Sequence, residues 1–176
     1  MTSTLQVQTI QGPTSGFDSN TVRVAGGHKL YAQGHVVQVQ AYHEADVPGH
    51  IETDSNSFQE TGIKNTITPQ FNNSLIICDF IVSVSTIYEI SSSELRTRLL
   101  LNDVQFGNLY TTGYMERSSS GQSKYQPTAF KTVHEGLAVG APVEFKVQFR
   151  SSLNGENVML AHDKSSITMT LTEIAQ

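Results

Sequence analysis

Residues 143–150 read Val143-Glu144-Phe145-Lys146-Val147-Gln148-Phe149-Arg150, and this stretch decides the fold class. Apolar and polar side chains alternate along it without a break. Successive side chains of a β-strand point to opposite faces of the sheet, so the pattern predicts a strand with one buried and one solvated face. A helix would need an apolar repeat near 3.6 residues, which this stretch lacks.

The same alternation recurs along the chain and predicts further strands at residues 35–42, 76–84, 95–101 and 167–172. Residues that share the phase of these strands should form one core. The predicted core consists of Ile76, Phe80, Val82, Leu99, Val143, Phe145, Val147, Phe149, Ile167, Met169 and Leu171.

Turn-forming pairs separate the apolar runs. Asn102-Asp103 and Asn154-Gly155 each lie between two apolar segments, where residues that tolerate positive φ predict tight hairpins. Regularly spaced turns and about eight short strands between residues 35 and 176 predict an all-β fold, a β-sandwich or jelly roll.

The charge of the chain limits its partners. Eleven Lys and Arg stand against sixteen Asp and Glu, for a formal net charge of −5, and no stretch gathers the basic residues. Binding to nucleic acid or to an anionic membrane needs a basic face, so we expect neither partner. No apolar run approaches the roughly 20 residues that span a bilayer, and the first residues lack the charged and apolar regions of a signal peptide.

The single cysteine, Cys78, lies in the apolar run Leu75-Ile76-Ile77-Cys78-Asp79-Phe80. One cysteine allows no intrachain disulfide, and a thiol in such a run is typical of a small core residue rather than a nucleophile. We therefore expect a chain that folds without cross-links in a reducing cytoplasm.

Residues 1–34 differ from the rest and contain two short apolar segments joined by Gly and Pro. The segments supply too few apolar side chains for a core of their own: Leu5, Val7, Ile10, Val22 and Val24. We predict a division near Gly34 into an amino-terminal attachment and oligomerisation segment, residues 1–34, and a sandwich module, residues 35–176. The alternative is that the short strands cover an edge of the same sandwich.

One polar stretch contains the side chains of a metal site: His43, Glu44, Asp46 and His50. Pro48-Gly49 interrupts it, and no HExxH spacing or cysteine pair accompanies it, so a polar loop is the favoured interpretation. A metal ion shared between subunits on a symmetry axis is the alternative. We predict no cofactor and no resident metal.

Catalytic groupings are absent from the sequence. It contains no GxSxG elbow, its carboxylates are scattered, and it has no tryptophan to line a polysaccharide groove. We expect no enzymatic activity.

The stretch 110–125 is long for a loop and contains four side chains suited to binding: Tyr110, Tyr114, Arg117 and Tyr125. Tyr and Arg are favoured contact residues because each buries a large area and keeps a polar tip. The stretch is a candidate ligand-binding loop. The alternative is a solvated hairpin tip whose tyrosines pack on their own sheet.

The order of several short segments resembles a module of bacteriophage virion proteins, and the likeness extends over residues 35–174. The segments are His35-Val36-Val37-Gln38-Val39, Phe58-Gln59-Glu60-Thr61-Gly62-Ile63, Asn65-Thr66-Ile67-Thr68-Pro69, Ser74-Leu75-Ile76-Ile77, Phe145-Lys146-Val147-Gln148-Phe149-Arg150 and Ser166-Ile167-Thr168-Met169-Thr170-Leu171-Thr172-Glu173-Ile174. The opening segments 5–10 and 20–24 look like the start of cyanophage virion proteins. The chain departs from the pattern at Asn73-Ser74-Leu75, where the usual lysine is absent.

This resemblance implies a structural protein of the virion, made in the host cytoplasm and assembled as a homotrimer. A chain of 176 residues leaves no room for a fibre shaft. We therefore expect a capsid decoration protein or head-fibre knob that contacts other virion proteins such as the major capsid protein. The alternative is a short tail-fibre or receptor-binding tip that recognises a glycan of the host surface.

Overall fold

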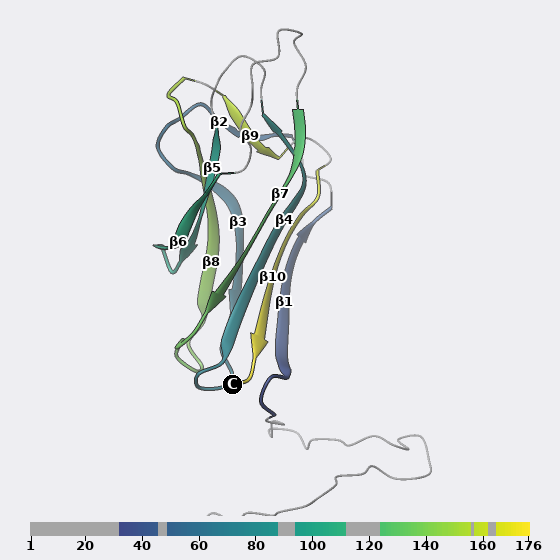
Figure 1. The fold of residues 1–176 in the computed structure, drawn as a ribbon, viewed down its shortest axis with the longest axis vertical. Coiled ribbons are helices and arrows are strands. Elements are labelled where there is room, and N and C mark those ends of the chain that lie inside the picture. The colour runs from purple at the N-terminus through teal and green to yellow at the C-terminus, as the bar shows by residue number, and fades with distance from the viewer. Residues whose placement is uncertain (1–31, 46–48, 88–93, 112–123, 156, 162–164) are drawn as a thin grey trace, which may run out of the picture. The chain divides into compact units, whose positions relative to one another are not determined.

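The computed structural model describes residues 32–45, 49–87, 94–111, 124–155, 157–161 and 165–176, and these residues contain ten strands and no helix. The all-β prediction is therefore confirmed (Figure 1). The strands are β1 (Val36–Glu44), β2 (Ile51–Thr53), β3 (Gln59–Ile67), β4 (Leu75–Ile87), β5 (Leu95–Leu101), β6 (Val104–Thr111), β7 (Lys124–His134), β8 (Val143–Ser151), β9 (Val158–Ala161) and β10 (Ile167–Ile174).

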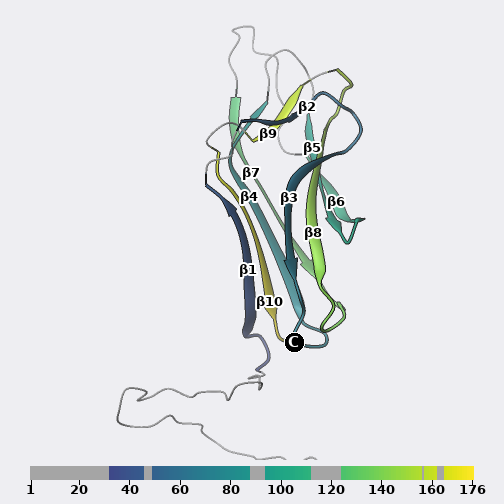
Figure 2. The same cartoon turned by 180° about the vertical axis from the view of Figure 1, so that it is seen from behind.

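Two antiparallel sheets form a β-sandwich, as the two opposite views show (Figures 1 and 2). The larger sheet has the order β1-β10-β4-β9-β2, with β7 paired to β4, and the smaller sheet has the order β3-β8-β5-β6. Without the short strands β2 and β9, the sheets are β1-β10-β4-β7 and β3-β8-β5-β6. In both sheets, strands that are distant in sequence lie side by side, and this is the strand order of a jelly roll.

The core lies between the sheets, where every second side chain of the central strands is buried. On β8, Val143, Phe145 and Val147 are buried, whereas Glu144 and Lys146 lie on the outer face. All eleven predicted core residues are buried, as is Cys78. Alternation along the strands thus predicted the inner face correctly.

The two predicted hairpins have different outcomes. Asn102 and Asp103 both have positive φ, and they join the antiparallel pair β5 and β6, so this hairpin is confirmed. At Asn154-Gly155 the hairpin prediction is wrong, because β8 belongs to the smaller sheet and β9 to the larger one. There the chain crosses between sheets, and Gly155 takes φ of 79° while its N–H donates to the Asp54 carbonyl.

Residues 1–31 lie outside the described part of the chain. The predicted attachment residues Leu5, Val7, Ile10, Val22 and Val24 therefore remain predictions. From Gln33 onward the chain forms one compact unit. No helix that could cross a membrane occurs among the described residues.

Candidate functional site

Of the four residues considered as alternative metal ligands, two lie in β1, on opposite faces. His43 is on the outer face, with its Nδ1 3.1 Å from the Thr168 hydroxyl, whereas Glu44 accepts a hydrogen bond of 3.3 Å from the Tyr42 hydroxyl. His50 precedes β2, and Asp46 lies outside the described residues. Across the described ranges, no three His, Cys, Asp or Glu side chains are grouped so that they could hold a metal ion.

The two ends of the candidate binding loop lie in strands of different sheets. Tyr110 lies in β6 opposite Thr97, and Tyr125 lies in β7 opposite Thr86. The loop proper is therefore shorter than the sequence suggested and runs from the smaller sheet to the larger one. Tyr114 and Arg117 lie outside the described residues, so their role stays a prediction.

Glu173 is a fully buried carboxylate near the end of β10. Its Oε1 accepts hydrogen bonds from the Gln70 N–H at 2.8 Å, the Phe71 N–H at 3.1 Å and the Ser74 hydroxyl at 2.8 Å. Its Oε2 accepts one from Gln38 Nε2 at 2.7 Å. Burial raises the pKa of Glu173, but these hydrogen bonds outweigh burial, so the net shift is downward.

These contacts show what the Glu173 carboxylate does. It fixes the loop between β3 and β4 to β10, and through Gln38 it also fixes β1. Because all four donors come from the protein itself, the carboxylate is a structural element and not a free catalytic acid.

Two further titratable groups lie in the core. His134 on β7 packs against the rings of Phe106 and Phe145, with centroids 3.6 Å and 5.0 Å away, and burial lowers its pKa to about 4. Burial, together with the neighbouring Asp79, raises the pKa of the Cys78 thiol to about 12. His134 is therefore neutral and Cys78 protonated near neutral pH, and both act as packing residues.

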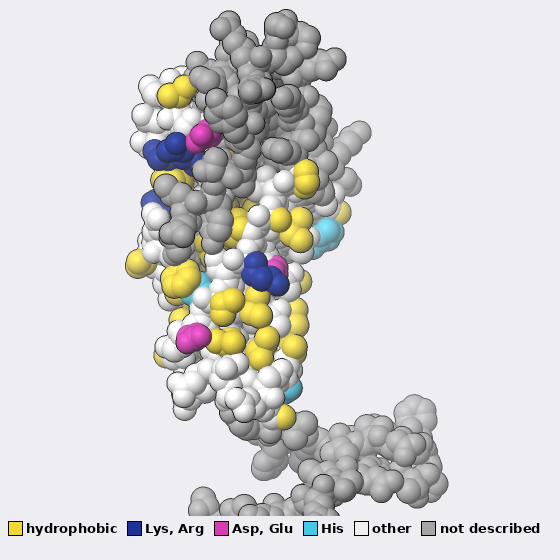
Figure 3. Space-filling model, viewed as in Figure 1, with side chains coloured by type: hydrophobic (Ala, Val, Ile, Leu, Met, Phe, Trp, Pro, Cys, Tyr) yellow, Lys and Arg dark blue, Asp and Glu magenta, His cyan; other side chains and the backbone are white. Residues whose placement is uncertain are grey.

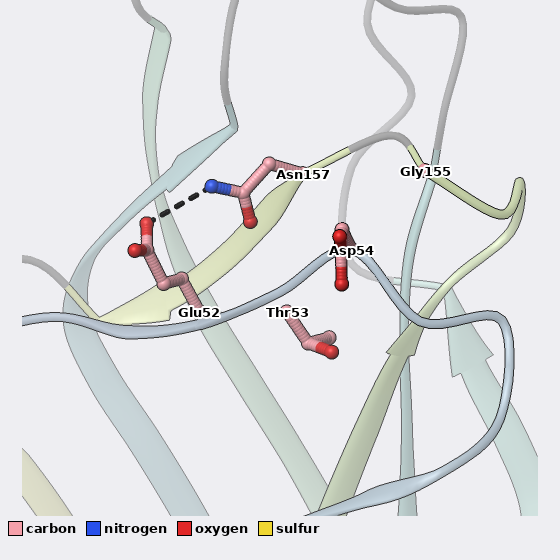
Figure 4. A pocket seen from close by; sticks show the side chains of 5 residues that line it. All are labelled: Glu52, Thr53, Asp54, Gly155 and Asn157. Atoms are coloured by element: carbon pink, nitrogen blue, oxygen red, sulfur yellow. Dashed lines mark hydrogen bonds between the residues drawn. The ribbon is translucent and has the colours of Figure 1, made fainter.

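Two surface hollows are lined by described residues. The first, about 350 Å³ in volume, is lined by Glu52, Thr53, Asp54, Gly155 and Asn157 (Figure 4). Glu52 and Asn157 point toward each other there and share a hydrogen bond of 3.1 Å. The second, about 270 Å³, has residues of β1 and β3 in its wall and is lined by Tyr42, Glu44, Ile51, Thr61, Gly62, Ile63 and Ile167.

The outer face of β1, β10, β4 and β7 is mostly uncharged. Four of its apolar side chains are about half exposed: Val36 at 53%, Val39 at 53%, Ile81 at 49% and Val133 at 47%. The register places Val39 and Val133 in one row with Thr172 of β10 and sets Ile81 opposite Thr168, whereas Val36 lies opposite Ile174. Figure 3 shows hydrophobic side chains gathered over these strands.

One ion pair crosses this face. Lys131 Nζ on β7 lies 3.1 Å from Asp79 Oδ1 on β4. The two charges of this pair neutralise each other. Around the pair, the face presents apolar and hydroxyl side chains.

The outer face of the smaller sheet is highly charged and contains a cluster that the sequence did not reveal. The guanidinium carbons of Arg98 and Arg150 lie 4.0 Å and 5.0 Å from the centroid of the Phe58 ring. Arg98 is on β5, Arg150 on β8, and Phe58 directly precedes β3. We call Phe58, Arg98 and Arg150 the Phe58–arginine cluster.

Sequence reasoning missed this cluster because its members are far apart in the chain. The available signal was the alternation Arg96-Thr97-Arg98, which places two arginines on one face of β5. Only the pairing of β5 with β8, which places Arg96 opposite Arg150, adds the third arginine.

Comparison with known proteins identifies no family. No protein-family model matches the chain, and no curated protein matches it in sequence. Among solved structures the chain is similar to dimeric latent PorU from Porphyromonas gingivalis, with 11% sequence identity and a TM-score of 0.43. The match covers 89% of this chain and 15% of that one, so the chain spans a small part of PorU.

Proposed function

We propose that the chain is a non-enzymatic structural protein of a bacteriophage virion, displayed on the particle surface as a capsid decoration protein or head-fibre knob. Two features support the proposal: the resemblance in segment order to phage virion modules, and the jelly-roll strand order, which viral capsid proteins commonly use. A fold by itself does not fix a function, so the proposal depends on a surface feature as well.

The observation that carries the proposal is the outer face of β1, β10, β4 and β7. Its half-exposed valines and isoleucine form an apolar surface, which is typical of a protein contact. We assign this face to contact between copies of the chain in a homotrimer. Two charged residues of this face, Lys131 and Asp79, already pair with each other, so contact would leave neither of them unpaired.

Light scattering on the full chain tests the assembly. Replacing Val39 and Val133 together with Glu should convert a trimer to a monomer and leave the far-ultraviolet spectrum unchanged. The matched control is Val104→Glu, because Val104 is 70% exposed and lies on the other sheet. A wild-type chain that is monomeric at micromolar concentration, or a trimer that survives the double substitution, would contradict the assignment.

A second function remains a candidate, a short tail-fibre or receptor-binding tip that recognises a host glycan. The Phe58–arginine cluster favours it, because half-buried guanidinium groups without a carboxylate partner suit recognition of acidic ligands. A decoration protein and a tip differ in the number of copies on each particle.

A further inference from the structure

The Phe58–arginine cluster differs from the other charged groups on its face. Arg96 pairs with Glu94 at 2.9 Å, and Lys146 pairs with Asp103 at 2.7 Å and with Glu144 at 3.0 Å. Lys64 pairs with Glu144 at 3.1 Å. Arg98 and Arg150 have no carboxylate within 4.0 Å among the described residues, although the chain carries an excess of acidic groups.

Neutral oxygens hold the two guanidinium groups instead. Arg98 donates to the amide oxygens of Gln148 at 2.7 Å and Gln105 at 3.2 Å. Arg150 donates to the Asn56 carbonyl at 2.9 Å. Both also lie over the Phe58 ring, which attracts cations through its negative face. Two positively charged guanidinium groups thus lie beside one aromatic ring, and no carboxylate among the described residues pairs with either of them.

A carboxylate is nearby, but an amide separates it from the arginine. Glu60 Oε1 accepts a hydrogen bond of 2.6 Å from Gln148 Nε2, while the oxygen of the same amide accepts from Arg98. Gln148 therefore occupies the place where a carboxylate could have paired with Arg98. A guanidinium has five N–H donors, and Arg98 uses two of them within the described part of the chain.

We propose that the Phe58–arginine cluster binds the carboxylate groups of an acidic polysaccharide, that is, of uronic-acid units. Arginine forks match a planar carboxylate with two parallel hydrogen bonds. The side chains that hold Arg98 are amides, Gln105 and Gln148, which suit sugar hydroxyls better than the apolar centre of a protein interface. Two uncompensated cations on an acidic chain are too few for a nucleic acid.

This inference goes beyond the structural role and holds wherever the protein sits on the particle. Affinity electrophoresis of the purified full chain tests it, with gels that contain polygalacturonate, dextran sulfate or neutral dextran. We expect polygalacturonate to retard the wild-type protein at low salt, with retardation falling as salt rises. The double variant Arg98→Gln/Arg150→Gln should bind about tenfold or more weakly, as the loss of charge-assisted pairs implies.

Arg96→Gln is the matched control, because it removes the same charge from the same face of β5 but from an arginine that already pairs with Glu94. It should bind almost as the wild type does, and all variants should keep the wild-type melting temperature within a few degrees. If Arg96→Gln and the double variant lost the same binding affinity, the proposal would be overturned, because binding would then depend only on the total charge of the protein. Stronger binding to dextran sulfate would overturn the carboxylate assignment, and no binding to any polysaccharide would favour an acidic protein partner.

Discussion

Replacing Glu173 with Gln tests how the loop between β3 and β4 is held. Gln has nearly the same shape as Glu, but it carries one amide group in place of a carboxylate oxygen. The remaining oxygen can accept from Gln70, Phe71 and Ser74 as before. The new amide group then faces Gln38 Nε2, which is itself a donor and also donates to the Thr68 carbonyl at 2.6 Å. Gln38 cannot flip its amide without losing that second hydrogen bond.

The magnitude follows from the hydrogen bonds. Those to a charged acceptor contribute about 1.5–3 kcal/mol each, against about 0.5–1.5 kcal/mol for neutral pairs. The substitution removes one charged hydrogen bond and weakens three, while the neutral amide is easier to bury than the carboxylate. We therefore expect a net loss of about 3 kcal/mol in the free energy of unfolding, which lowers the melting temperature by about 6–12 °C for a chain of this size.

Urea and thermal denaturation at pH 7 measure the effect. Glu144→Gln is the control, because Glu144 is a surface carboxylate with the two lysine partners Lys64 and Lys146, and it should change stability little. A Glu173→Gln protein within about 0.5 kcal/mol of the wild type, inside the range of ordinary surface substitutions, would refute the reasoning. Its amide would then have found partners that the structure does not show.

Three further predictions concern the core and the division of the chain. Phe145→Ala should cost about 3–5 kcal/mol in denaturant unfolding, because the Phe145 ring is fully buried against His134, and a loss below 1 kcal/mol would mean that the site collapses. His134 has a folded-state pKa of about 4 against its usual 6.5, so the unfolded chain binds the proton more tightly. The contribution of His134 to the free energy of unfolding should be full above pH 6.5 and fall by up to about 3 kcal/mol as the pH drops to 4. His134→Leu should flatten the plot of unfolding free energy against pH between pH 7 and 5, a range in which Glu173 stays ionised. A truncation that starts at Gly34 lacks the predicted oligomerisation segment, which we expect the trimer to need in addition to the outer face of β1, β10, β4 and β7. It should therefore unfold cooperatively but be monomeric, whereas aggregation without a melting transition would place residues 1–33 in the core of the module.

Side-chain alternation predicted much of the fold. It is a local property, and a strand with one buried face shows it directly, so β5, β8 and β10 and their inner residues were predictable. The assignment of strands to sheets was not, because pairing depends on contacts between distant segments. Asn154-Gly155 shows this limit, because the same residue pair that commonly forms a hairpin turn lies here in a connection between the two sheets.

The surfaces were harder to predict than the core. Val39 and Ala41 alternate with polar residues as a buried face would, yet both point outward on β1. Glu173 shares the inward phase of Leu171, but the sequence does not show how a carboxylate can be buried there, because the donors that satisfy it come from distant segments. The Phe58–arginine cluster depends on three elements that only the folded chain brings together.

Counting copies of this protein in purified phage particles tests the central proposal most directly. Quantitative mass spectrometry of particles, normalised to the major capsid protein, gives the number. We expect a fixed number of copies in each particle. This number should be a multiple set by the symmetry of the capsid, with the copies grouped in trimers. A few copies per particle would place the protein at the tail tip instead, and its absence from purified particles would contradict a role in the virion.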